Sequence, residues 1–277
     1  MDSNNKLSKI LTYTILTIGT LFILVPMYVT IVTAFKTPQE CSKSFFTLPG
    51  SFYLGNFKEV IGRAHYWTYV KNSVVITVIS VAVIIFFAPL VSYAISRNFE
   101  KKYYKFLYFY IISGIFVPFQ VIMLPIVKEM TKFKMMNQFG MIVLYISLGL
   151  IQSIFLCVGY LKSIPKELEE AASIDGCSPW KTFTKVIYPL MSPMVATILI
   201  LNALWICNDF LLPLTILNKT PNMWTLPLFQ YNFKSQYSFD YNLAFASFTL
   251  SMLPIIAIYV FTQKYIISGL TAGSVKD

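Results

Sequence analysis

Charge is the scarcest property of this 277-residue chain: only 12% of its residues are charged, whereas 56% are hydrophobic and 17% are aromatic. Soluble domains usually carry about twice that charged fraction. A disordered chain is excluded as well, because the sequence is too apolar and too rich in Phe and Tyr. We therefore expect lipid, rather than water, to surround most of the protein.

Groups that could carry out chemistry are also scarce. The chain has four cysteines, and two of them, Cys157 and Cys207, lie within apolar stretches, which excludes a disulfide scaffold. The single histidine, His65, has no His or Cys neighbour at ligand spacing, so we expect no metal site. No Gly-x-x-x-x-Gly-Lys-Ser/Thr loop, serine nucleophile elbow or carboxylate pair is evident. We therefore expect a protein that is not an enzyme and holds no cofactor of its own.

Long stretches without charge predict membrane-spanning helices. Five stretches contain no ionisable side chain of Asp, Glu, Lys, Arg or His over 22 to 26 residues, and a sixth is interrupted only by Asp209. About 20 apolar residues in a helix cross the hydrocarbon core, where backbone groups must bond within the helix. The sequence thus predicts an all-α integral membrane protein with six spans, near residues 10–35, 72–96, 106–127, 139–161, 193–217 and 241–263.

The first of these stretches follows Lys6 and Lys9, as the apolar core of a signal peptide would. Such cores span only about 7–15 residues, so we expect this helix to be retained.

Six prolines fall within the predicted spans: Pro26, Pro89, Pro118, Pro125, Pro213 and Pro254. Each removes one backbone hydrogen bond and can kink its helix. Membrane helices tolerate proline where neighbouring groups satisfy the freed carbonyl. The alternative interpretation is that these prolines kink helices that surround a pathway and move during transport.

The net charge of +10 orients the chain only weakly. Six spans place both termini on one side, and that side carries 12 of the 22 Lys and Arg residues. Because positive loops stay inside, we expect both termini in the cytoplasm. The chain shows no basic face with interleaved aromatic residues, so we expect no nucleic acid partner.

The most charged segment, residues 163–190, separates the fourth and fifth predicted spans. Pro165 suits the first turn of a short helix with acidic residues near its start, and Gly176 suits a left-handed end. Ser178 then caps a second helix, which Pro189 should stop. These two helices form either an amphipathic hairpin on the bilayer surface or a docking element for a cytoplasmic partner.

The same segment resembles a known family. Glu170-Ala171-Ala172, a glycine four positions later and Val186-Ile187-Tyr188-Pro189 look like the Glu-Ala-Ala…Gly…Ile-x-Leu-Pro signature of permease subunits in binding-protein-dependent ABC importers. The resemblance implies a type I importer permease fold over residues 1–277, with coupling helices that sit in a cleft of an ATPase subunit. The residues it assigns to this coupling are Glu170, Ala171, Ala172, Asp175, Gly176 and Pro189.

Further matches point to the sugar-importer permeases, above all to the maltose-type subunit with six helices. They are Phe35-Lys36-Thr37-Pro38, Val117–Ile122, Asn208–Pro213 and the tail that begins with Gly269, Leu270, Thr271, Ala272 and Gly273. In relatives this tail, here residues 264–277, reaches the cytoplasmic ATPase dimer. The resemblance implies a di- or oligosaccharide of the maltose, raffinose or multiple-sugar type as the solute.

The resemblance also implies a location in the plasma or inner membrane of a bacterium, and several partners. These are a second, different permease subunit, two cytoplasmic ATPase subunits that bind ATP and magnesium, and an extracellular or lipid-anchored sugar-binding protein.

Asp209 is the ionisable residue that falls within a predicted span, where a carboxylate is costly and should face protein or water. Asn202, Trp205 and Asp209 follow at helical spacing and share one face. This polar and aromatic stripe either borders a translocation pathway or forms hydrogen bonds between helices. In maltose-type relatives the sugar site lies mostly in the partner permease.

Residues 218–242 are rich in aromatic side chains, among them Trp224, Phe229 and Tyr231. They form either an interfacial aromatic belt or, as the resemblance implies, a contact with the extracellular binding protein.

Two other functions stay open. A self-sufficient secondary transporter would favour several ionisable groups within its spans and internal repeats, and neither is evident. An ABC importer permease for a solute other than a sugar is the second.

Overall fold

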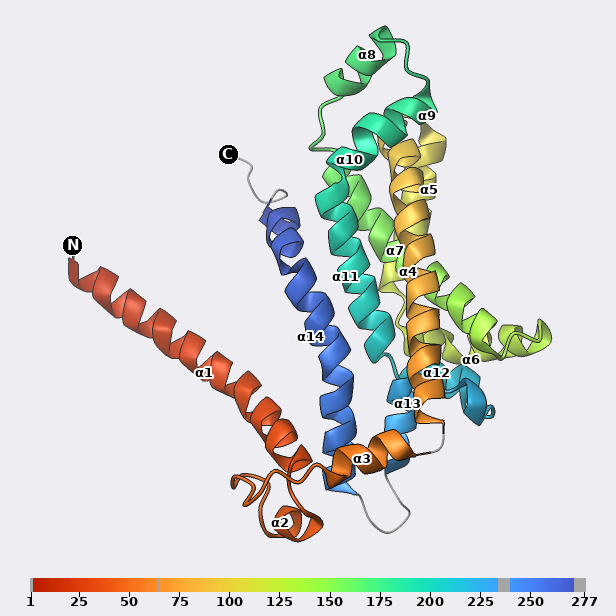
Figure 1. The fold of residues 1–277 in the computed structure, drawn as a ribbon. Coiled ribbons are helices and arrows are strands. Elements are labelled where there is room, and N and C mark those ends of the chain that lie inside the picture. Colours follow the sequence, from red (N-terminus) through yellow and green to blue (C-terminus); the bar gives the residue numbers. More distant parts are fainter. Residues whose placement is uncertain (1, 64, 234–239, 272–277) are drawn as a thin grey trace. The chain divides into compact units, whose positions relative to one another are not determined.

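The computed structural model describes residues 2–63, 65–233 and 240–271, and their regular structure is entirely helical. The helices are α1 (Asp2–Ala34), α2 (Pro38–Lys43), α3 (Gly55–Gly62), α4 (Tyr66–Arg97), α5 (Lys102–Ser113), α6 (Phe119–Lys132), α7 (Gln138–Leu161), α8 (Glu167–Ile174), α9 (Pro179–Thr182), α10 (Tyr188–Leu190), α11 (Ser192–Asn208), α12 (Leu211–Leu217), α13 (Leu226–Gln230) and α14 (Tyr241–Thr271). Short 3-10 turns and one π-helical turn, η2 (Phe183–Ile187), connect some of them. The predicted all-α class is confirmed (Figure 1).

Three helices among the described residues are long and apolar enough to cross a membrane: Ser8–Ala34, Tyr66–Arg97 and Gln138–Leu161. Two bent helix pairs, Lys102–Phe116 with Phe119–Lys132 and Pro179–Leu190 with Ser192–Asn208, raise the number to five if each pair is one span. Helix α14 is 31 residues long and is not among these three helices or two pairs. The predicted count of six spans therefore stays a prediction.

The predicted third span, residues 106–127, is not one straight helix. Its two halves meet at an angle of 103°. The residue before a proline is disfavoured in the helical region, and Val117 takes the extended conformation, with φ −92° and ψ 108°. Pro118 therefore ends the first half, and α6 begins at Phe119.

The predicted fifth span, residues 193–217, is also interrupted. Helix α11 ends at Asn208, Asp209 is extended, and α12 begins at Leu211. Pro213 lacks the N–H that would bond the carbonyl of Asp209, and its ring clashes with that carbonyl in a regular helix. The interruption thus follows from a proline four residues further along the chain.

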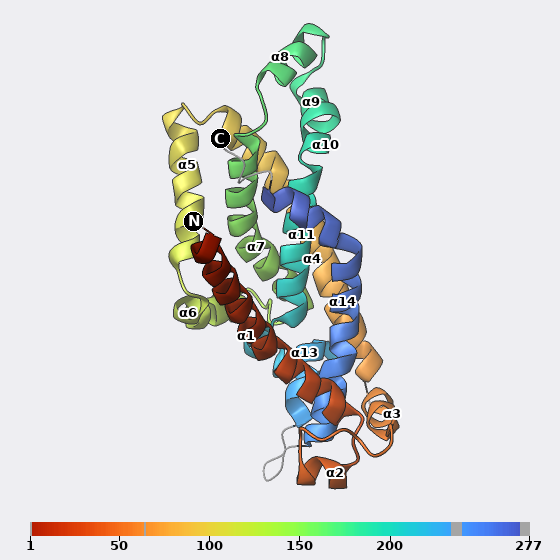
Figure 2. The ribbon, with the colours of Figure 1, turned by 90° about the vertical axis from the view of Figure 1, so that its left-hand side faces the viewer.

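The described chain groups into two compact units. The larger one holds Trp67–Leu228 and the last part of α14. Within it, α4, α7 and α11 run side by side, and the segment α8–α10 extends beyond their ends (Figures 1 and 2). The three helices approach closely at Gly149, where a Cβ atom would lie 2.6 Å from both Asn202 Oδ1 and Ile84 Cδ1.

The smaller unit holds the residues up to Tyr66 together with Phe229–Pro254. Buried Asn56 on α3 donates to the carbonyls of Ala34 and Lys36, at 2.9 and 2.8 Å, and so satisfies backbone groups where α1 ends. Its own side-chain oxygen accepts from Asn242 at 2.8 Å. These bonds fix α3 and the start of α14 to the end of α1.

Candidate functional site

The segment between α7 and α11 folds as the predicted pair of short helices, which we call the hairpin (residues 163–190). Its first helix, α8, starts at Glu167, two residues after Pro165, so the expectation that Pro165 lies in its first turn is wrong. Gly176 has a φ of +77°, as predicted. The N–H of Cys177 bonds to the carbonyl of Ala172 at 2.9 Å, and that of Gly176 to Ser173 at 3.0 Å. This pattern is a Schellman motif, which closes α8 and turns the chain back.

The second arm of the hairpin begins as predicted and ends later than predicted. The Ser178 side chain accepts from the N–H of Lys181, and Pro179 takes the first helical position. Pro189 does not stop the helix at once: the N–H of Tyr188 bonds back five residues to Phe183, and α10 continues to Leu190. The bend of 72° follows there, before α11. One π-helical turn thus lets the chain pass the proline.

The outer surface of the hairpin combines acidic and apolar side chains. Glu170, Ala171 and Asp175 are exposed, as a partner contact requires. Ala172 is buried, so its small size serves packing within the hairpin. The large apolar side chains of Leu168, Ile174 and Trp180 are 41%, 88% and 58% exposed. Exposed apolar groups of this size, ringed by charge, are typical of a surface that binds another protein.

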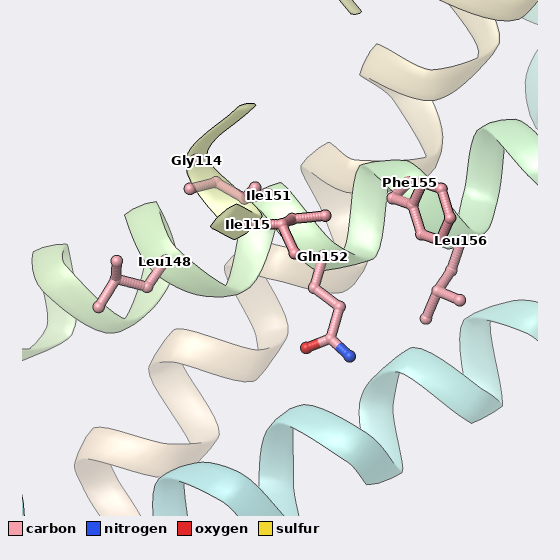
Figure 3. A pocket seen from close by; sticks show the side chains of 7 residues that line it. All are labelled: Gly114, Ile115, Leu148, Ile151, Gln152, Phe155 and Leu156. Atoms are coloured by element: carbon pink, nitrogen blue, oxygen red, sulfur yellow. The ribbon is translucent and has the colours of Figure 1, made fainter. Parts of the chain in front are cut away.

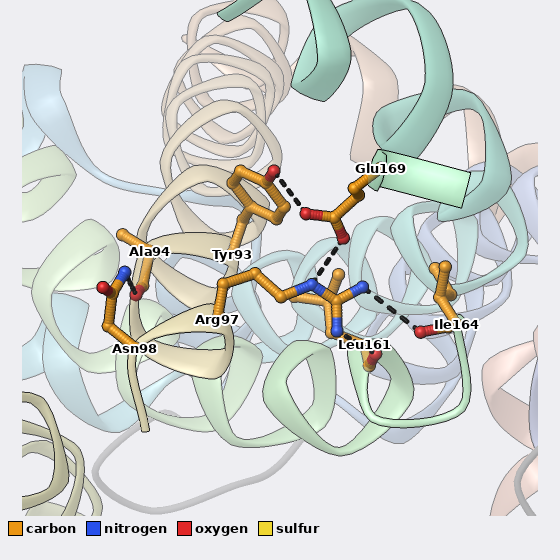
Figure 4. A network of polar contacts seen from close by, with 7 residues as sticks. All are labelled: Tyr93, Ala94, Arg97, Asn98, Leu161, Ile164 and Glu169. Atoms are coloured by element: carbon orange, nitrogen blue, oxygen red, sulfur yellow. Dashed lines mark hydrogen bonds and ion pairs between the residues drawn. The ribbon is translucent and has the colours of Figure 1, made fainter. Parts of the chain in front are cut away.

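A partly buried ion pair attaches the hairpin to the bundle. Arg97, the last residue of α4, donates from Nε to Glu169 Oε1 on α8 at 2.5 Å, and only 12% and 17% of the two side chains are exposed. The same guanidinium donates to the carbonyls of Leu161 and Ile164 at 3.1 and 3.2 Å. Tyr93 donates to the other oxygen of Glu169 at 2.7 Å (Figure 4). We call Arg97, Tyr93 and Glu169 the clamp.

The clamp was not found from the sequence. Arg97 reads as one of several cations that set orientation, and Glu169 as one of several acids near a helix start. The two residues lie 72 positions apart, and nothing in a single sequence pairs them. The sequence offers one signal for this ion pair. An arginine lies at the very end of an apolar run, and another loop carries an excess of acidic residues.

Aromatic packing adds a second attachment of the hairpin to α4. The ring centroid of Phe183 lies 5.2 Å from that of Tyr93 and 6.0 Å from that of Trp180. Within the second arm, Phe183 and Ile187 are buried, whereas Trp180 is exposed.

Asp209 makes contacts within the bundle. Its Oδ2 accepts from the hydroxyl of Tyr145 on α7 at 3.0 Å, and its Oδ1 accepts from the N–H of Leu211 at 3.1 Å, which caps the start of α12. The ring of Trp205 stands edge-on to Tyr145 at 5.4 Å. Tyr145, fully buried within an apolar run, is a partner that the sequence did not reveal.

Asn202 is likewise bonded within the bundle. Its amide donates to Ser153 Oγ on α7 at 3.0 Å and to the carbonyl of Ile198 at 2.8 Å. For Asn202 and Asp209 these contacts support the interhelical alternative. Trp205, 39% exposed, is the member of the stripe that can meet a solute.

A cavity of about 410 Å³ lies beside α7, and Figure 3 shows its lining side chains. The residues are Gly114, Ile115, Leu148, Ile151, Gln152, Phe155 and Leu156. Gln152 is the polar side chain in this set, and it is exposed in the middle of a largely apolar helix. An amide is poorly tolerated in lipid, so this face of α7 should meet water or protein. Sequence reasoning passed over Gln152 because it carries no charge.

The aromatic residues predicted to contact a binding protein differ in their surroundings. The indole N–H of Trp224 donates to the carbonyl of Leu217 at 3.1 Å, so its ring is tied to the protein. Phe229 is buried, with ring centroids 6.0 Å from Tyr66 and 5.3 Å from Phe233. Tyr231 is 54% exposed and offers a surface. The rest of this segment, residues 234–239, lies outside the described residues.

The segment Phe35-Lys36-Thr37-Pro38 builds a compact turn after α1. Lys36 is fully buried, and its Nζ donates to the carbonyl of Ser44 at 2.8 Å. Thr37 and Glu40 form a capping box at the start of α2. The backbone N–H groups of Thr37 and Gly50 both bond to Glu40 and hold the pKa of its carboxyl below the usual value. This motif therefore organises the loop.

The predicted tail begins as a helix, because α14 continues to Thr271 and includes Gly269, Leu270 and Thr271. Ala272 and Gly273 lie outside the described residues. No group of three or more His, Cys, Asp or Glu side chains in the described part of the chain could hold a metal ion.

Comparisons with known proteins agree with this architecture. The family model described as "Binding-protein-dependent transport system inner membrane component" matches residues 85–271, more than half of the chain. The multiple sugar-binding transport system permease protein MsmG of Streptococcus mutans is 44% identical over 281 residues, covering 100% of both chains. The melibiose/raffinose/stachyose import permease protein MelC of Bacillus subtilis is 30% identical over 255 residues, covering 91% of each.

A solved structure supports the fold. A chain of a bacterial ABC transporter involved in the import of the acidic polysaccharide alginate aligns with a TM-score of 0.82 at 21% identity, covering 96% of this chain and 99% of that one. The hairpin sequence, the match over residues 85–271 and the full-length similarity to permeases agree. This chain therefore belongs to the family of binding-protein-dependent transport system inner membrane components.

Proposed function

We propose that this permease is a membrane-spanning subunit of an ATP-driven importer for a di- or oligosaccharide. The hairpin carries the proposal: it extends beyond the helix bundle and presents acidic and large apolar side chains around the Glu170-Ala171-Ala172 motif. Such a surface fits a groove on another protein better than a bilayer, because Glu170 and Asp175 share it with Ile174.

The partner at this surface is an ATPase subunit. The chain contains no phosphate-binding loop, so ATP and magnesium bind to that partner, which does the hydrolysis. A complete importer then needs two ATPases, a second and different permease, and an extracellular or lipid-anchored binding protein that delivers the solute. In this arrangement the hairpin end, both termini and the tail from Gly269 face the cytoplasm.

The names of relatives support a sugar as the solute. They include permeases for multiple sugars and for melibiose, raffinose and stachyose, and the arabinooligosaccharides transport system permease protein AraQ of Halalkalibacterium halodurans is 34% identical over 279 residues. Within the pathway, Trp205 and Gln152 are the best placed contacts, since an indole ring stacks on sugar rings and an amide bonds to hydroxyls. Asn202 and Asp209 do not contact the solute in this proposal; they bond α11 and the following break to α7. Tyr231 is the proposed contact for the binding protein, whereas Phe229 is buried and Trp224 is bonded to the carbonyl of Leu217.

Purification of the tagged permease in mild detergent tests the proposal. We expect an ATPase and a second permease to purify with it, and ATP hydrolysis to rise when the sugar-loaded binding protein is added. Glu170→Arg should weaken retention of the ATPase at least about tenfold, because it reverses a charge in the contact. The matched control is Glu100→Arg, an exposed acid between α4 and α5.

Two results would contradict the proposal. A permease that purifies alone and takes up solute into vesicles without ATP would be a secondary transporter. A co-purifying binding protein that binds amino acids or ions, and no sugar, would leave the importer in place and change its solute.

A further inference from the structure

The three long helices that meet the hairpin are connected to it in different ways. Helix α7 leads into the hairpin through Lys162–Lys166, and α11 leaves it after Met191, so the covalent chain joins both to it. Helix α4 has no such connection: its last residue, Arg97, precedes Glu169 by 72 positions. Any displacement of the hairpin reaches α4 only through side-chain contacts.

Figure 4 shows that Tyr93 and Arg97, both on α4, bond to one carboxylate, that of Glu169. Glu169 accepts from Arg97 with one oxygen and from Tyr93, one turn earlier on α4, with the other. Arg97 uses its remaining N–H groups on the carbonyls of Leu161 and Ile164, where α7 ends. The planar guanidinium thus joins the ends of α4 and α7 to α8 in one fixed geometry.

Glu169 also differs from its neighbours on α8. Glu167 and Glu170 are exposed, whereas Glu169 is largely buried, because successive residues of a helix point about 100° apart. The acid next to the family motif therefore faces the bundle, while Glu170 and Ala171 of the motif face outward. Glu170 can contact a partner without disturbing the clamp.

We propose that the clamp of Arg97, Tyr93 and Glu169 is the positioning contact that makes α4 move together with the hairpin when the ATPase displaces it. The inference rests on the proposed coupling function of the hairpin. Without the Glu169 carboxylate, α7 and α11 still follow the hairpin through the chain, whereas α4 keeps only the ring contact of Tyr93 with Phe183 and follows less closely. ATP hydrolysis then continues with little solute movement.

The variant Glu169→Gln tests this in the complete importer, reconstituted in lipid with its ATPases and binding protein. It removes the charge and retains the shape. We expect assembly and basal hydrolysis to persist, and the solute transported per ATP to fall roughly tenfold, since a bond to a charged group is lost. Glu167→Gln, an exposed acid on the same helix, is the matched control and should transport as the parent does.

Distances between spin labels separate a coupling role from a merely structural one. The labels replace exposed Ser173 on α8, Ala94 on α4 and Gly159 on α7, in a background where the four native cysteines are removed. In the parent, both the 173–94 and the 173–159 distance should stay the same between nucleotide-free and ATP-trapped complexes. In Glu169→Gln, only the 173–94 distance should change or broaden.

The proposed role of the clamp is refuted if the 173–94 distance shifts between the nucleotide-free and ATP-trapped complexes as much in the parent as in Glu169→Gln. Equal transport per ATP in Glu169→Gln and Glu167→Gln would refute it too. Where Glu169→Gln does not assemble, Tyr93→Phe removes one hydroxyl and should give the same effect in weaker form. If these variants behave as the parent while Glu170→Arg still releases the ATPase, the clamp fails and the proposed function stands.

Discussion

At the scale of single residues, Asp209 shows how a carboxylate is kept within an apolar bundle. One oxygen accepts from buried Tyr145 on a neighbouring helix, and the other caps the next helix through Leu211. Both bonds hold the break between α11 and α12 in place. The side chain thus compensates for the backbone bond that Pro213 cannot make.

Substitutions at Asp209 should therefore act on stability. Asp209→Asn can accept from Leu211 and donate to Tyr145, so we expect near-parental amounts of folded permease and of transport. Asp209→Leu leaves the Tyr145 hydroxyl buried without its partner, which costs about 1–3 kcal/mol, and should lower the midpoint of thermal unfolding in detergent. Asn208→Leu, at the exposed neighbouring position, is the control. Loss of transport by well-folded Asp209→Asn would instead give the carboxylate a direct role in the pathway.

At the scale of elements, the hairpin depends on the single left-handed residue Gly176. A Cβ atom there would meet no atom within 4 Å. Replacing this glycine is therefore unfavourable because of its backbone conformation, and not because of a steric clash. An L-residue in this region costs about 1–2 kcal/mol. The Schellman bonds to Ala172 and Ser173 form only while the left-handed turn persists.

Gly176→Ala should accordingly loosen the hairpin. We expect faster hydrogen exchange of the amides in residues 168–180 and weaker retention of the ATPase, and Gly176→Asn should restore part of both, because Asn tolerates the left-handed region. Gly159→Ala, in open space on α7, should be neutral or stabilising. If Gly176→Ala exchanges as slowly as the parent, the glycine is not what holds this turn.

Helices were predictable from the sequence where the length of an apolar run alone determines the structure. The charge-free runs at residues 72–96 and 139–161 lie within α4 and α7, because an apolar run this long has no other stable form in lipid. Prolines were harder to interpret. Pro89 lies inside the continuous helix α4, whereas Pro118 bends its span. Pro213 lies within α12, and the helix is interrupted four residues earlier, at Asp209. Whether a proline breaks a helix depends on what surrounds the freed carbonyl, which sequence does not show.

At the scale of the whole molecule, the hairpin was predictable and its attachment was not. Ser178, Gly176 and Glu170 act through neighbours in the chain, so their spacing indicates their roles. The clamp of Arg97 and Glu169, the bond of Tyr145 to Asp209 and the exposure of Gln152 depend on how helices pack. The exposed face of Tyr231 and the buried face of Phe229 likewise looked alike in sequence.

The charge at the two ends of the larger unit supports the predicted orientation, which total charge left nearly undecided. In the larger unit, α6 and α12 lie at the end opposite the hairpin (Figure 1). The hairpin end carries eight Lys and Arg residues: Arg97, Lys101, Lys102, Lys105, Lys162, Lys166, Lys181 and Lys185. The opposite end carries five: Lys71, Lys128, Lys132, Lys134 and Lys219. This difference favours a hairpin in the cytoplasm.

Labelling of single cysteines by a membrane-impermeant maleimide checks this orientation in a background without the four native cysteines. Helix α4 has 32 residues, about 48 Å at 1.5 Å per residue, so it is long enough for the two ends of the unit to lie on opposite sides of a bilayer. Asn222→Cys should react in intact cells, and Ser173→Cys only after the membrane is opened. The reverse pattern would place the hairpin outside, where no ATPase could reach Glu170, and the proposed coupling would fail with it.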